Sequence, residues 1–94
     1  MESKTMYKVN HSWLYGNVKP YFQGQGIQLM KDDWLHIEKC LAQIPPDRHR
    51  YVMRDYLSLW NATVHEKDNV VKTKYNARYE ANTYIRNAAF DKED

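Results

Sequence analysis

Two adjacent prolines, Pro45 and Pro46, interrupt the clearest helical pattern in the chain. Before them, apolar residues recur at the spacing of one helical face: Trp34, Ile37, Leu41 and Ile44. After them, a second apolar stripe comprises Met53, Tyr56, Leu57, Trp60 and Val64. Because proline cannot continue a helix, the sequence predicts one helix over about 33–44, with Asp32 or Asp33 as N-cap, and another over about 46–62. The short connection predicts a tight helical hairpin.

A long third helix is predicted for the C-terminal third of the chain. Thr63 and Glu66 have the spacing of a capping box, and neither glycine nor proline follows before Phe90. This favours a helix over about 64–90, with Asp68 or Asn69 as the competing start. Its expected inner stripe is Val70, Ala77, Ala81, Tyr84 and Ala88. The small alanines there would let a neighbouring helix approach closely.

Residues 1–30 combine aromatic side chains with helix-breaking residues. Tyr and Trp alternate with Gly16, Pro20, Gly24 and Gly26, which predicts an irregular arm whose rings pack onto the helices. Residues 91–94 form a short acidic tail. The expectation is an all-α fold in a single domain: the arm, a three-helix body over 31–90, and the tail.

Composition narrows the classes of function. The 94 residues carry a net charge of only +2, which is far from the strongly basic profile of many nucleic-acid binders. Aromatic residues make up 14%, led by eight tyrosines, a residue suited to half-buried contact surfaces. The single cysteine allows no disulfide within the chain, and no signal-peptide-like or membrane-spanning run is present. The sequence therefore predicts a cytoplasmic location and no membrane partner.

The strongest candidate site is a ridge on the predicted third helix. Lys74, Arg78, Asn82 and Arg86 stand four residues apart and so share one side of a helix. Lys72, Tyr75 and Tyr79 lie beside them. Cations neutralise phosphates, asparagine pairs with adenine, and tyrosine stacks on unpaired bases, so this pattern favours contact with DNA or RNA. An ordinary solvated face and a surface for a protein partner are the alternatives.

A second basic cluster begins the predicted second helix, with Arg48 and Arg50 near Arg54. Arginines at a helix start can assist an anion site, or they can pair with nearby acids. His36 and Cys40 share a helical face, but no second short-spaced ligand pair accompanies them. The sequence therefore predicts no metal site, no cofactor and no catalytic residues.

In size and texture, the stretches IPPDRHRYVMRDYLSLW and YNARYEANTYIRN resemble small helical proteins encoded by enterobacterial phages and prophages. The resemblance covers residues 34–87 and implies a role in phage DNA metabolism or in blocking a host protein. It supplies no site residues. The leading hypothesis from the sequence is a small non-enzymatic nucleic-acid-associated protein. The alternative is a protein-binding adaptor or inhibitor that acts through its Tyr, Trp and Arg side chains, either alone or as a homodimer.

Overall fold

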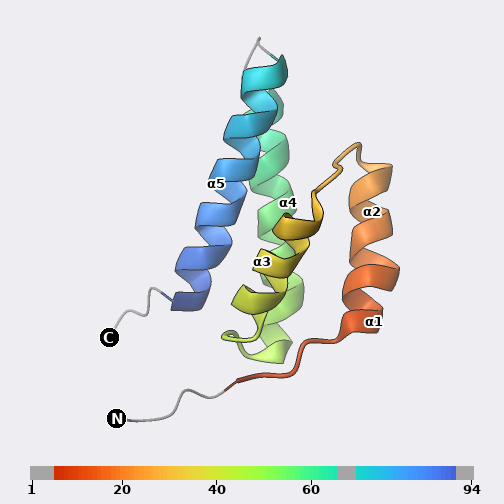
Figure 1. Ribbon diagram of the computed structural model, residues 1–94, viewed down its shortest axis with the longest axis vertical. Helices are drawn as coiled ribbons and strands as arrows, with labels where there is room; N and C mark the ends of the chain where they lie inside the picture. Colours follow the sequence, from red (N-terminus) through yellow and green to blue (C-terminus); the bar gives the residue numbers. More distant parts are fainter. Residues whose placement is uncertain (1–5, 66–69, 91–94) are drawn as a thin grey trace.

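The computed structural model describes residues 6–65 and 70–90, with the backbone alone for His65 and for residues 70–75. The described residues are all-α, with no strand among them. The elements are α1 (His11–Trp13), a π-helical turn (Leu14–Val18), α2 (Lys19–Gly24), α3 (Lys31–Leu41), a 3₁₀ turn (Pro46–Arg48), α4 (His49–His65) and α5 (Val70–Phe90). The segment that contains α1 and α2, then α3, α4 and α5, run in alternating directions along the long axis of the molecule, as Figure 1 shows.

The prediction of an irregular arm is wrong for residues 11–24, which form one continuous helix through α1, the π-helical turn and α2 (the N-terminal helix). The Asn10 side chain caps it by accepting a hydrogen bond from the Trp13 N–H at 3.0 Å. Proline inside an α-helix collides with the carbonyl four residues earlier, here that of Gly16. The π-helical turn directly before Pro20 is wider than an α-turn, so it accommodates the ring without ending the helix.

The bounds of the other helices also differ from those predicted. Helix α3 ends at Leu41 rather than at residue 44, and a turn leads from it to Pro45, which biases Ile44 away from helical angles. Asp33 is its third residue rather than its cap, and its side chain accepts the Met30 N–H at 2.9 Å. The predicted start at residue 64 is wrong, because Thr63 and Val64 belong to α4. Helix α5 begins at Val70, and Glu66, Asp68 and Asn69 lie outside the described residues.

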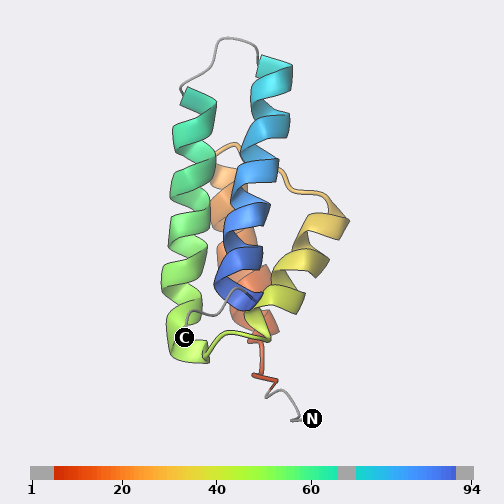
Figure 2. The same ribbon diagram turned by 90° about the vertical axis from the view of Figure 1, so that its left-hand side faces the viewer.

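The tight pair of helices is α4 with α5, whereas the sequence predicted a hairpin of α3 with α4. The two helices run antiparallel and side by side in Figures 1 and 2. The buried face of α5 is Ala77, Ala81, Ile85 and Ala89, while Tyr84 is half-buried and Ala88 exposed. The alanines bring the backbones close, as the sequence predicted, and α3 packs on the other side of α5.

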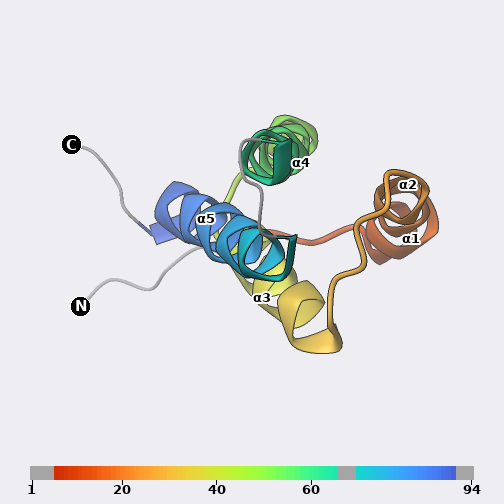
Figure 3. The same cartoon turned by 90° about the horizontal axis from the view of Figure 1, so that it is seen from above.

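Large rings separate the N-terminal helix from the other helices. Leu14, Val18 and Phe22 form its buried stripe. The Phe22 ring lies 5.7 Å from that of Trp34 on α3 and 6.0 Å from that of Tyr56 on α4, between ring centroids. Viewed from above in Figure 3, this helix stands apart from the close α4–α5 pair. Rings of this size hold backbones further apart than alanines do, which leaves room for a surface groove beside α4.

The end of α3 is held by a side chain from the start of α4. His49 is buried, and its Nε2 lies 2.7 Å from both the Leu41 and the Ile44 carbonyl oxygens. Carbonyls only accept hydrogen bonds, so Nε2 carries the proton and donates to both. The last carbonyls of a helix have no partner within it, and His49 therefore fixes the turn around Pro45 and Pro46.

Candidate functional site

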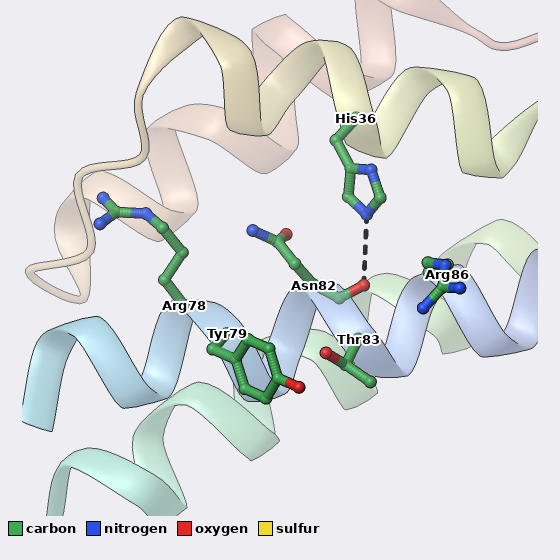
Figure 4. Close-up of a pocket in the computed structure, with 6 residues that line it drawn as sticks. All are labelled: His36, Arg78, Tyr79, Asn82, Thr83 and Arg86. Atoms are coloured by element: carbon green, nitrogen blue, oxygen red, sulfur yellow. Dashed lines mark hydrogen bonds between the residues drawn. The ribbon is translucent and has the colours of Figure 1, made fainter.

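The predicted ridge on α5 is not a single free surface. Arg78 and Asn82 turn toward α3, whereas Tyr79 and Arg86 are exposed. Figure 4 shows the Arg78 and Asn82 side chains extending to a different side from the Tyr79 ring. Lys72, Lys74 and Tyr75 belong to α5, but their side chains lie outside the described residues.

Arg78 and Asn82 belong to a polar network around a buried carboxylate. Asp33 accepts a hydrogen bond from Arg78 Nε at 2.9 Å and another from Asn82 Nδ2 at 3.1 Å. The Tyr56 hydroxyl donates to Asn82 Oδ1 at 2.6 Å. Burial, and after it the Asp33 charge, raises the pKa of Tyr56 well above its usual range. The network therefore joins α3, α4 and α5, and it engages two of the residues that the sequence assigned to binding.

A shallow cleft of about 270 Å³ lies between α3 and α5 (the α5 cleft). Figure 4 labels its lining residues: His36, Arg78, Tyr79, Asn82, Thr83 and Arg86. His36 lies over the middle of the cleft, with its Nε2 3.2 Å from the Asn82 backbone oxygen. Because a carbonyl oxygen only accepts hydrogen bonds, His36 Nε2 is the donor. With His36 and Arg78 both hydrogen-bonded to the protein, Arg86 is the main cation that this cleft offers to a ligand.

Cys40 is fully buried beside His36, with 3.7 Å between its Sγ and His36 Nε2. Among the described residues, no group of three or more His, Cys, Asp or Glu side chains has a geometry that could hold a metal ion. Burial raises the pKa of the Cys40 thiol to about 11. The thiolate is the nucleophilic form, so this environment suppresses the reactivity of Cys40.

We therefore expect a thiol reagent such as Ellman's reagent to leave Cys40 unmodified in the folded protein near pH 8. In denaturant the same residue should react within the mixing time, because an exposed cysteine has a pKa of about 8.5 and is partly ionised near pH 8. Absorbance of the released chromophore measures both rates. Rapid labelling of the folded protein would show that the cysteine is accessible and ionised, contrary to its placement in the core.

A groove of about 580 Å³, larger than the α5 cleft, lies between the N-terminal helix and α4 (hereafter the groove). The N-terminal helix contributes Trp13, Asn17, Val18, Tyr21 and Phe22 to its lining, and α4 contributes Arg50, Met53, Arg54 and Leu57. Both helices present residues four apart to the groove, so each wall is a helical face.

The groove has an apolar floor and a polar, aromatic rim. Val18, Phe22, Met53 and Leu57 are buried, whereas Tyr21 is 58% exposed. Arg50 and Arg54 are exposed on the α4 side of the rim. The Arg54 guanidinium lies 5.3 Å above the Tyr51 ring and 3.9 Å from Asp55. Since the Arg54 and Asp55 side chains are both more than half exposed, solvent screens their attraction, and Arg54 remains available to a ligand.

Of the site residues predicted from the sequence, one lies on the α4 wall of the groove and none on the opposite wall. Arg50 was a predicted site residue, and it lines the groove, while Arg48 is exposed on the 3₁₀ turn and does not. Trp13 and Tyr21 were missed because the segment was expected to be irregular. The available signal was the four-residue spacing of Leu14, Val18 and Phe22, which keeps one face inward when a wide π-helical turn separates the residues.

No helix in the described part of the chain is both long enough and apolar enough to cross a bilayer. Comparison with family models, curated proteins and solved structures finds no match to this chain.

Proposed function

We propose that this chain is a non-enzymatic protein-binding module, and that its groove holds a segment of a partner protein by an apolar anchor. The observation that carries the proposal is the composition of the groove. Protein interfaces are enriched in Tyr, Trp, Phe, Met and Arg and depleted in Lys, Asp and Glu, and most of the lining residues are of the enriched types.

The arrangement of those residues supports the same conclusion. Binding energy at interfaces concentrates in a few well-packed side chains, most often Trp, Tyr and Arg. Here Met53 and Leu57 lie at the floor, with Trp13, Tyr21 and Arg50 around it.

The nucleic-acid hypothesis receives less support from the geometry. It depended on a continuous ridge of four side chains, and Arg78 and Asn82 are engaged with Asp33. Proteins that bind nucleic acids make many contacts to phosphates along the binding surface. The apolar floor of this groove offers no hydrogen-bond donor to a phosphate. Binding of a nucleic acid is therefore an alternative outcome, which a binding test with a single strand can detect.

A steric variant tests the proposal. Asn17 is exposed in the groove one helical turn from both Trp13 and Tyr21, so Asn17→Trp should fill the groove without removing a core contact. Peptides selected on the wild-type protein from a random displayed library should bind this variant at least about tenfold more weakly, because the anchor loses its buried site.

Gln23→Trp is the matched control for the added bulk. Gln23 is exposed on the same helix but does not line the groove, so this variant should bind the selected peptides as the wild type does. Fluorescence anisotropy with labelled peptides measures both affinities, and circular dichroism checks that both variants remain helical. Equal affinities in all three proteins would place the binding surface elsewhere and overturn the proposal.

A further inference from the structure

The groove does not end at Trp13. A second cleft of about 220 Å³ adjoins it, and Trp13 and Arg50 line both cavities. The other residues that line this second cleft are Lys8, Asn10, Pro46 and His49. The two cavities therefore form a track that passes from the apolar floor, across Trp13 and Arg50, to the segment before α1 that carries Lys8.

The charges along this track have one sign. Lys8, Arg50 and Arg54 line it, and among the described residues no Asp or Glu lines either cavity. His49 adds no free donor through Nε2, which is committed to the Leu41 and Ile44 carbonyls.

None of the described acids on neighbouring elements lines the track. Glu38 accepts hydrogen bonds from the Tyr15 hydroxyl and from His11, and Asp33 is buried in its network with Arg78 and Asn82. Asp55 accepts a hydrogen bond from the Tyr84 hydroxyl, and its pair with Arg54 is solvent-exposed, while Asp47 is exposed on the 3₁₀ turn. Solvent screens such exposed pairs, so the cations of the track remain available to an external anion.

We infer, building on the proposed function, that the partner segment is acidic: an apolar side chain occupies the groove, and neighbouring Asp or Glu side chains lie over Arg50 and Lys8. Arginine binds carboxylates through paired hydrogen bonds, which fixes the segment's orientation as well as adding affinity. Complementary rim charges also speed association, and their effect weakens with salt.

An acidic polypeptide fits this track better than a nucleic acid does. A peptide places an apolar and a charged side chain within a few residues of each other, which matches an apolar floor next to a cationic cleft. A single strand binds through cations that follow its backbone and exposed rings that stack on its bases. The groove has arginines at one rim only, and its floor is buried and apolar: Val18, Phe22, Met53 and Leu57.

The test is the composition and charge dependence of the selected peptides. We expect peptides that carry Asp or Glu close to an aromatic or aliphatic residue, with affinity that falls as salt rises. The double variant Lys8→Glu, Arg50→Glu should weaken their binding at least about tenfold. The control Lys31→Glu, Lys39→Glu makes the same change in net charge at two exposed sites on α3, outside both cavities, and should have little effect.

The outcomes separate this inference from the proposed function. Neutral or basic peptides whose binding is lost in Asn17→Trp would overturn the acidic assignment and leave the groove as a protein-binding site. A selection without any groove-dependent peptide would overturn both. An oligo-dT strand that binds the wild type, but not the Lys8→Glu, Arg50→Glu variant, would assign the track to single-stranded nucleic acid and overturn the inference.

Discussion

Replacing Asp33 by alanine is expected to lower the free energy of unfolding by about 3 kcal/mol. The Asp33 side chain is only 9% exposed, and it accepts hydrogen bonds from Arg78, Asn82 and the Met30 N–H. Its removal leaves a partly buried guanidinium and two other donors without their acceptor, and each unsatisfied buried group is costly. Thermal unfolding followed by circular dichroism should show a decrease in Tm of about 15 °C.

Asp32→Ala provides the matched control for this experiment. Asp32 also lies in the first turn of α3 but is exposed, so its loss removes a favourable interaction with the helix dipole and little else. We expect a destabilisation of less than about 1 kcal/mol. If the two alanine variants unfolded at the same temperature, the network would not be what joins α3 to α5.

His49→Ala is expected to lower the free energy of unfolding by about 2 kcal/mol. The substitution removes a buried ring and leaves the Leu41 and Ile44 carbonyls without their shared donor at the end of α3. Urea unfolding measures the change. Since His49 also lines the second cleft, binding assays should use Lys8 and Arg50 variants instead.

The comparison for His49 is His11→Ala. His11 lies 3.1 Å from Glu38, but its side chain is 62% exposed, so that pair should contribute less than about 1 kcal/mol. If the His49→Ala variant were as stable as the His11→Ala variant, His49 would not be what caps the end of α3.

Local periodicity predicted α3 and α4 to within three residues at each end. The stripe from Met53 to Trp60 is buried as predicted, and the break at Pro45 and Pro46 separates α3 from α4. These features depend on residues within a few turns of one another, where the hydrophobic pattern and the proline geometry act together.

The rest depended on contacts that the sequence does not encode locally. Asp33 meets Arg78 and Asn82 across 45 and 49 residues, so the conversion of the α5 ridge into an internal network could not be inferred from its spacing. Pro20 was interpreted as a helix breaker because a π-helical turn has no simple sequence signature. Because that helix was not predicted, one wall of the groove was absent from the candidate site residues.

Binding in the groove can be tested most directly by an NMR titration of isotope-labelled protein with the tightest peptide from the selection. We expect the largest chemical-shift changes at the Trp13 indole and at the backbone amides of Tyr21, Arg50 and Leu57, around the groove. Changes confined to Tyr79, Thr83 and Arg86 would place the partner in the α5 cleft and contradict the proposed function.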